Sequence, residues 1–257
     1  MDGISDNFED AVQKMSSVLA VTGKVIPVTL DDMQLKAILK NGNIVKGESQ
    51  IPKEAIKQKS PIERLMLEPE DAVPLKEALD AIKEADAIVM GPGSLYTSIT
   101  SNLLVKDISK AVRKSNAIKI YISNIMTQPG ETTGFKVSDH LKVLRKYGGK
   151  DIVDYAIVNT GEITEELKEK YNQEGAELVK LDEEDIKSMG IKIVGENLVK
   201  IQNGTVKHDS DKLAEVLADT IMEKKLLYDK KKIIEYMYLS QRVKARDREE
   251  KGKQGEI

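Results

Sequence analysis

Between Ala87 and Tyr171 the sequence repeats one pattern three times: a short apolar run, a polar loop and then a stretch with helical spacing. The apolar runs are Ala87–Met90, Ile118–Ile122 and Tyr155–Val158. Strands that alternate with helices are typical of β-α-β units, and such units build a parallel sheet with helices packed on it. The pattern therefore predicts an α/β fold around a mostly parallel sheet.

The composition agrees with such a sheet and excludes several classes of protein. Hydrophobic residues make up 40% of the chain but aromatic residues only 4%, so the core must be aliphatic, as buried parallel strands usually are. The 40 basic and 43 acidic residues give a net charge of -3, which supplies no general attraction to nucleic acid or to an anionic membrane. The absence of cysteine excludes disulfides, thiolate metal sites and a cysteine nucleophile.

The apolar runs are far shorter than the roughly 20 residues that cross a membrane. The first residues, from Met1 to Asp6, have neither the basic nor the apolar segment of a secretory signal. We therefore expect a cytoplasmic protein.

The rest of the chain predicts further elements and two domains. Asn-Gly at Asn41 and Gly42 indicates a hairpin, and therefore a small β-hairpin insertion. We expect an α/β domain over 1–227, with a helical C-terminus, and a charged helical tail over 228–257 with a disordered end. Helices are predicted at Phe8–Leu19, Pro74–Ala85, Thr97 or Asn102 to Lys114, Val137–Tyr147, Thr164–Tyr171 and Leu213–Leu227. Strands are predicted at Lys24–Thr29, Gln34–Leu39, Asn43–Ser49, Arg64–Leu67, Leu178–Leu181, Ile191–Val194, Leu198–Ile201 and Val206–His208.

The strongest local signal for a binding site follows the first apolar run, in the sequence GPGSLYTS. Gly91 and Gly93 allow the backbone to turn tightly and approach a ligand. Ser94, Thr97 and Ser98 place hydroxyls near the free amides at the start of the next helix, a setting that suits phosphate. A Gly-Pro-Gly sequence alone also fits a simple tight turn with Ser94 as the helix cap.

A second polar loop favours the binding site over the simple turn. Asn124, Thr127 and Gln128 follow the second apolar run, and neighbouring parallel strands end at the same edge of a sheet. Glu131 in this loop and Asp139 beyond it could serve a metal or act as a base, but lone carboxylates are common and no metal site is predicted. The two histidines, His140 and His208, are better explained as structural residues.

The motifs GPGSLYTSITSNLLV and NIMTQPGET resemble those of the gluconeogenesis factor (YvcK-like) family, within the wider superfamily of 2-phospho-L-lactate transferase (CofD-like) proteins. Weaker similarity extends over roughly residues 5–220. The resemblance implies a Rossmann-like fold, a cytoplasmic protein and a role in growth on gluconeogenic carbon sources and in normal cell shape. It also implies a UDP-sugar-like ligand, with no certain cofactor.

The family's glycine-rich first turn has no counterpart in this sequence, so we expect the chain to begin at an internal point of the family pattern and its sheet to have an unpaired edge. Two functions stay open. A non-enzymatic regulator that binds a nucleotide sugar is favoured, because no residue demands transfer chemistry. The alternative is a phospho-lactate-type transferase that acts on a deazaflavin. The expected partner is a phosphorylated small molecule rather than nucleic acid or a membrane, and a homo-oligomer is compatible with the sequence.

Overall fold

The computed structural model describes residues 23–226, which fall into two compact units. The first unit ends at Asp209 and contains all the described strands, whereas the second begins at Ser210 and contains helix α9 (Ser210–Leu226). The predicted helix Phe8–Leu19 and the predicted tail, 228–257, lie outside the described residues.

A four-stranded parallel sheet is the centre of the first unit, as the repeated pattern predicts. Its order is β4 (Ala87–Met90), β5 (Ile118–Ile122), β6 (Tyr155–Asn159) and β7 (Lys192–Glu196). The strands follow one another in sequence order, and each pair is parallel. The α/β prediction is therefore confirmed.

One row of side chains across this sheet belongs to the main core. The register aligns Met90 with Tyr121, Tyr121 with Ala156 and Ala156 with Ile193. The first three are buried, and all four pack into one apolar cluster with residues of the helices. At the edge of the sheet as described, β4 is less covered, and Val89 is 40% exposed.

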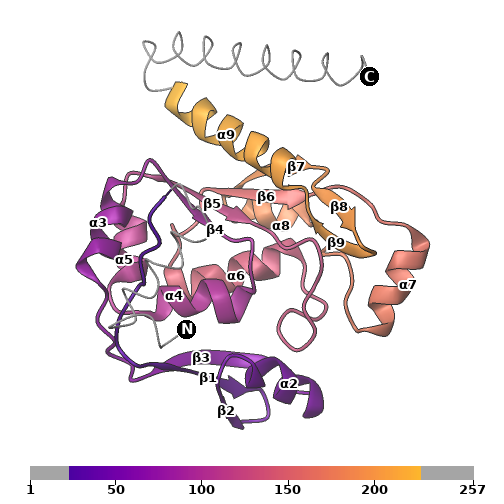
Figure 1. The fold of residues 1–257 in the computed structure, drawn as a ribbon, viewed down its shortest axis with the longest axis horizontal. Coiled ribbons are helices and arrows are strands. Elements are labelled where there is room, and N and C mark those ends of the chain that lie inside the picture. The colour runs from indigo at the N-terminus through magenta and orange to yellow at the C-terminus, as the bar shows by residue number, and fades with distance from the viewer. Residues whose placement is uncertain (1–22, 227–257) are drawn as a thin grey trace, which may run out of the picture. The chain divides into compact units, whose positions relative to one another are not determined.

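The connections between the strands supply the helices. Figure 1 shows α4 and α6 between the parallel sheet and a second, smaller sheet. The helical segments of the first unit are α2 (Gln50–Lys57), α3 (Lys76–Glu84), the π-helical turn η1 (Leu95–Thr100), α4 (Ser101–Leu104), α5 (Ile108–Lys114), α6 (Val137–Gly148), α7 (Glu165–Gln173) and α8 (Glu183–Ser188). At the start of α7, Thr164 Oγ1 accepts a hydrogen bond from the Leu167 amide at 3.4 Å, as expected of an N-cap.

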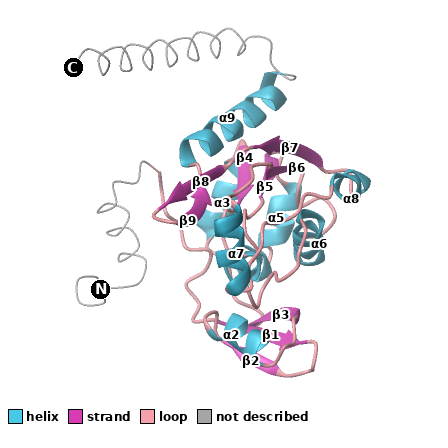
Figure 2. Cartoon of the chain, turned by 90° about the vertical axis from the view of Figure 1, so that its right-hand side faces the viewer, coloured by secondary structure: helices cyan, strands magenta, loops and turns pink. Residues whose placement is uncertain are grey.

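The smaller sheet and α2 form a small lobe, residues 34–68, seen at the bottom of Figure 2. Its strands are antiparallel in the order β2 (Ile44–Lys46), β1 (Gln34–Leu39) and β3 (Ile62–Glu68). The lobe is joined to α6, because the Leu65 amide donates to the Tyr147 hydroxyl at 2.8 Å and Lys146 Nζ donates to the Glu63 carbonyl at 2.6 Å.

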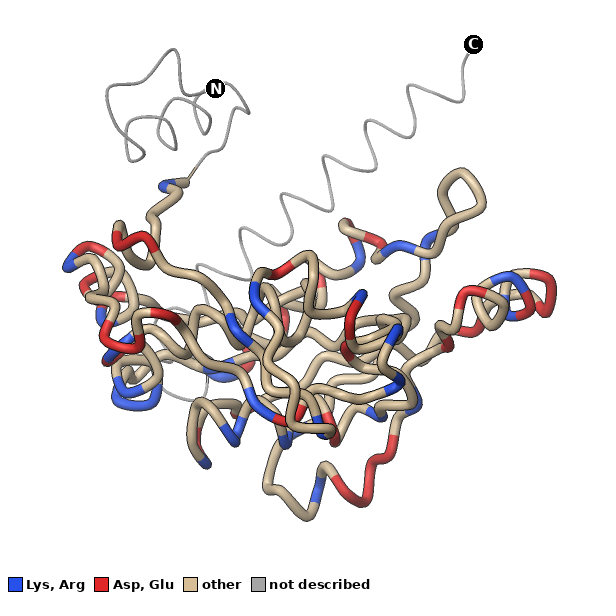
Figure 3. The backbone as a smooth tube through the Cα atoms, turned by 90° about the horizontal axis from the view of Figure 1, so that it is seen from below, with Lys and Arg blue, Asp and Glu red and all other residues tan. Residues whose placement is uncertain are grey.

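Two further strands, β8 (Val199–Gln202) and β9 (Thr205–His208), form an antiparallel hairpin near the end of the first unit. They pair around the Asn203-Gly204 turn that the sequence indicates. Basic and acidic residues are interspersed along the described chain (Figure 3). Within residues 23–226 no helix is both long and apolar enough to cross a membrane.

Three predicted elements are wrong. Lys24–Thr29 is not a strand: Val28 accepts one backbone hydrogen bond, from Leu75, and Pro27 has no amide to donate. Leu178–Leu181 makes only isolated bridges, to Met126 and Lys136. The helix expected to run to Lys114 is broken, because the buried Val105 is extended and Asp107 has a φ of 61°. Conversely, α2 and α8 form where no element is predicted.

Gly130 joins the loop after β5 to the small lobe. Its φ is +81°, and a Cβ at this position would lie 2.2 Å from the carbonyl oxygen of Pro52 in α2. Gly134, in the same loop, has a similar φ of +71° but no atom within 4 Å of the corresponding position. Alanine substitutions at the two positions can therefore be compared: both carry the free-energy cost of a positive φ, but only the one at Gly130 adds the cost of the close approach.

We predict that Gly130→Ala lowers the free energy of unfolding by about 3 kcal/mol, because it adds overpacking to the strain of a positive φ. Gly134→Ala should cost only about 1 kcal/mol, which is the backbone part alone. Urea denaturation of both variants measures the difference. Equal losses in the two variants would show that the contact with Pro52 is unimportant.

His140 lies on α6 in the apolar core with none of its surface exposed. It packs against the rings of Tyr121 and Phe135, with centroid distances of 6.3 and 5.7 Å. Neither ring nitrogen has a hydrogen-bond partner among the described residues. Burial lowers the pKa of His140 to about 4, so this histidine is neutral in the folded protein at neutral pH.

This burial makes stability depend on pH. The unfolded chain takes up a proton at His140 near the ordinary pKa of about 6.5, whereas the folded chain does so only near pH 4. Stability is therefore lost as the pH falls below about 6.5. We predict that unfolding in urea at pH 7 and pH 5 gives a loss about 1 to 2 kcal/mol larger for the natural chain than for His140→Leu. The same loss in both chains would contradict the assignment to His140.

Candidate functional site

The ends of β4 and β5 meet at one edge of the parallel sheet, and Gly91 makes their close approach possible. Gly91 has a φ of +97°, and a Cβ on it would lie 2.9 Å from the carbonyl oxygen of Ile122. A side chain would therefore collide with the neighbouring strand as well as strain the backbone. The sequence argument attributes this glycine to ligand approach, whereas the structure gives it this contact between strands.

Polar side chains from the two strand ends form a hydrogen-bonded group, which we call the strand-end cluster: Ser94, Asn124 and Gln128. Gln128 Nε2 donates to Ser94 Oγ at 2.8 Å, and Asn124 Nδ2 donates to Gln128 Oε1 at 3.3 Å. All three side chains are half-buried. The structure thus brings together residues that lie 34 positions apart in sequence and that the sequence analysis assigns to one pocket.

Glu131 connects the same two loops in a way that the sequence does not reveal. Its carboxylate accepts from the Tyr96 amide at 3.3 Å and from Thr97 Oγ1 at 3.1 Å. Glu131 is only 7% exposed, and this burial raises the pKa of its carboxyl, partly offset by the bonds from Thr97 and Tyr96. A carboxylate of the protein itself therefore occupies one amide and one hydroxyl at the start of η1, where the sequence predicts that a ligand binds.

Other donors nearby are left open. The amides of Gly93 and Ser94 donate no hydrogen bond to any of the residues from 23 to 226. Ser98 is exposed, and its Cβ lies 3.4 Å from the position that a Cβ on Gly93 would take. A negatively charged group could therefore bind two amides and a hydroxyl at this turn without displacing Glu131.

Thr127 is placed differently from its predicted companions. It is 2% exposed; its amide donates to the Glu177 carbonyl at 2.7 Å, and its hydroxyl accepts from the Glu177 amide at 2.9 Å. These two bonds tie the loop after β5 to the backbone of Glu177. Gln128 is held in turn, because its amide donates to the buried Thr132 hydroxyl at 2.8 Å.

At the end of β6, the polar side chain of Asn159 bonds to other residues of the protein. Asn159 Oδ1 accepts from the amides of Gly161 and Leu198, both at 3.0 Å. A Cβ on Gly161 would lie 1.9 Å from Asn197 Oδ1. The polar end of this third strand is therefore not free to face a ligand, because the Asn159 side chain bonds to Gly161 and to Leu198 after β7.

His208, which the sequence analysis explains as a structural residue, contacts the end of β5. From β9 its ring Nε2 lies 3.2 Å from the Ser123 carbonyl, which is a hydrogen-bond acceptor, so Nε2 carries the proton and donates. Burial lowers the pKa of His208, and the bond to Ser123 partly offsets this. Its place at the end of the predicted strand Val206–His208 is the only sequence feature that points to this contact with Ser123.

The carboxylates do not form a metal site in the part of the chain that is described. No group of three or more His, Asp or Glu side chains suited to a metal is found within residues 23–226. Asp139 instead accepts from the Lys136 amide at the start of α6 and pairs with Lys142 at 2.9 Å. Burial raises the pKa of Asp139, but the bonds from Lys142 and Lys136 together outweigh it and hold the pKa below its ordinary range, so Asp139 is a poor base.

Comparison with known proteins identifies the family. Residues 1–199 match the family described as 2-phospho-L-lactate transferase CofD. The chain is 58% identical over 255 residues to a "Putative gluconeogenesis factor" of Clostridium acetobutylicum, covering 99% of this chain but only 56% of that relative. It is 43% identical over 223 residues to the "Gluconeogenesis factor" of Bacillus subtilis, covering 87% of this chain and 69% of the relative.

The fold has a solved counterpart. A crystal structure of protein BH3568 from Bacillus halodurans matches with a TM-score of 0.78 and 42% identity, over 84% of this chain and 69% of that one. The chain thus spans little more than half the length of the first of these curated relatives and about two thirds of the others. The chain belongs to the CofD family and, within it, groups with the proteins named gluconeogenesis factor.

Proposed function

We propose that this chain belongs to a cytoplasmic regulator that binds a nucleotide sugar, of the UDP-sugar type, at the strand-end cluster. The observation that carries the proposal is the convergence of Ser94, Asn124 and Gln128 beside the free amides of Gly93 and Ser94. The relatives named gluconeogenesis factor support the regulatory role. Growth on gluconeogenic carbon sources and normal cell shape are the processes in which we place it.

The ligand's two chemical parts match two parts of the cluster. The diphosphate would accept hydrogen bonds from the Gly93 and Ser94 amides and from the hydroxyls of Ser94 and Ser98. The amide side chains of Asn124 and Gln128 would bond to the sugar or ribose hydroxyls, since each offers both a donor and an acceptor. Gly91, Thr97 and Thr127 support these groups through their contacts with Ile122, Glu131 and Glu177.

We predict that Ser94→Ala weakens the binding of UDP-N-acetylglucosamine about tenfold, because a hydrogen bond to a charged phosphate is worth about 1.5 to 3 kcal/mol. Isothermal titration of the full chain measures this. The matched control is Ser188→Ala, which removes an exposed serine from α8 and should leave affinity unchanged. Equal affinities of all three proteins would remove Ser94 from the site, and the absence of binding by the natural chain would refute the proposal.

The charge of the Glu131 carboxyl leads to a second prediction about the same ligand. Its raised pKa means that the carboxyl gains a proton above its ordinary range as the pH falls, which removes a negative charge near the diphosphate. The affinity of the natural chain should therefore rise from pH 8 to pH 5.5. Glu131→Gln should bind about threefold more tightly at pH 8 and show a smaller pH dependence, because glutamine keeps an acceptor for Tyr96 without the charge. Weaker binding by this variant at pH 8 would contradict the repulsion.

A transferase is the second candidate, favoured by the family match and by the buried carboxyl of Glu131. A carboxyl with a raised pKa, hydrogen-bonded beside a polar pocket, is suited to proton transfer. Product formation from a deazaflavin acceptor and a nucleotide-activated phospho-lactate distinguishes the two functions. If the natural chain forms product and Glu131→Gln does not, the protein is an enzyme rather than a non-enzymatic regulator.

A further inference from the structure

A cavity of about 790 Å³ lies between the small lobe and the loop that carries Glu131. This volume falls within the range of sites that hold small molecules. None of the eight residues expected at the strand-end site lines it. The cavity is therefore separate from the proposed nucleotide-sugar site, although Glu131 borders both.

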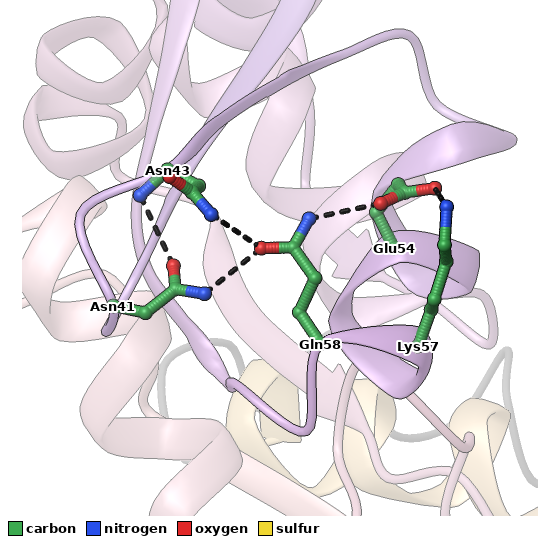
Figure 4. Close-up of polar contacts among 5 residues, drawn as sticks. All are labelled: Asn41, Asn43, Glu54, Lys57 and Gln58. Carbon is green, nitrogen blue, oxygen red and sulfur yellow. Dashed lines mark hydrogen bonds and ion pairs between the residues drawn. The ribbon is translucent and has the colours of Figure 1, made fainter.

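Asn41 and Gln58 follow and precede two residues of the cavity lining, Lys40 and Lys59, and belong to a hydrogen-bond network in the small lobe (Figure 4). Gln58 Oε1 accepts from Asn41 Nδ2 at 2.8 Å and from Asn43 Nδ2 at 2.7 Å, so the end of α2 is tied to the β1–β2 turn. The Asn41 amide also donates to Ser60 Oγ at 2.9 Å. These bonds join the sequence neighbours of Lys40 to those of Lys59, and both lysines contribute to the small-lobe wall of the cavity.

The two lysines are the open positive charges of this wall. Nearby Lys57 pairs with Glu54 at 3.2 Å, and Glu54 also accepts from Gln58 Nε2 at 2.9 Å (Figure 4). Lys40 and Lys59, by contrast, form no ion pair with any residue in the range 23–226, and both are exposed. Two unpaired ammonium groups at one end of a cavity favour an acidic group in that position.

The rest of the lining is largely apolar. Ile56 of α2 is 54% exposed and lines the cavity. Pro61, Pro129 and Phe135 add further apolar surface from both sides of the cavity. An apolar ligand body would remove this surface from water.

The far side of the cavity carries hydrogen-bond acceptors. Glu131, Asp139 and Glu174 line it, and the first two carboxylates also accept hydrogen bonds within the protein, from Thr97 and from the Lys136 amide. These groups disfavour a second negative charge and favour N–H or O–H donors on the ligand. The lining thus distinguishes the two ends of a bound molecule.

We propose that this cavity is a second small-molecule site, which binds a compound with an apolar body, one acidic group held by Lys40 and Lys59, and hydrogen-bond donors toward Glu131. This site uses none of the residues proposed to contact the nucleotide sugar, and Glu131 is the residue that borders both sites. It is positioned to sense a metabolite of that chemistry through the loop at Gly130, which touches α2 at Pro52.

Fluorescence titration of the full chain with 8-anilinonaphthalene-1-sulfonate tests the site, because this probe has an aromatic body, one sulfonate and one N–H donor. We expect saturable binding that Lys40→Gln and Lys59→Gln each weaken about fivefold or more. The matched control is Lys53→Gln, which neutralises an exposed lysine of α2 that does not line the cavity. Ile56→Asn should weaken binding as well.

The proposal would be overturned by the absence of saturable binding, or by the same affinity in Lys40→Gln, Lys59→Gln and Lys53→Gln. Ser94→Ala separates this site from the nucleotide-sugar site. We expect that variant to bind the fluorescent probe with unchanged affinity. A loss of probe binding in Ser94→Ala that matches the loss in Lys40→Gln would mean that the probe reports the strand-end cluster, and would also overturn the second site.

Discussion

The arrangement of both sites depends on the carboxylate of Glu131, which is bound by the Tyr96 amide and by Thr97 Oγ1. A buried carboxylate is costly unless hydrogen bonds stabilise it, so the loop after β5 can rest against η1 only where these donors are available. Once it does so, Gln128 comes within 2.8 Å of Ser94. The strand-end cluster therefore follows from a contact between two loops rather than from the strands alone.

The same loop is fixed from three further directions. Thr127 bonds to Glu177 on one side, Gly130 touches Pro52 of the small lobe on another, and the buried Thr132 closes the turn on Gln128. Such multiple attachment reduces the entropy that a flexible loop would lose on binding a ligand. Gly130 and Gly134 both have a positive φ in this loop, but only Gly130 makes one of these attachments, because only Gly130 lies close to another segment.

The sequence predicts best what depends on local pattern. β4 and β5 begin and end where their apolar runs do, because short aliphatic runs between polar loops have few alternatives to a buried strand. The sequence does not predict the long-range contacts. These are the hydrogen bonds from the Tyr96 amide to Glu131, between Thr127 and Glu177, and from His208 to the Ser123 carbonyl. Helix α2 is missed for a different reason, since Pro52 near its start and its short length leave little periodicity to read.

The position of Glu131 gives the two proposed sites a physical connection. Its carboxylate holds η1 beside the strand-end cluster, and the same residue lines the cavity under the small lobe. A ligand that bonds to this carboxylate from the cavity would compete with the donors of Tyr96 and Thr97 and so change the charge and position that a diphosphate meets at Ser94. Because coupling between two binding sites is reciprocal, a nucleotide sugar at the cluster would change the affinity of the cavity by the same factor. A regulator that responds to two metabolites would use such a link, whereas a transferase needs both molecules in one pocket.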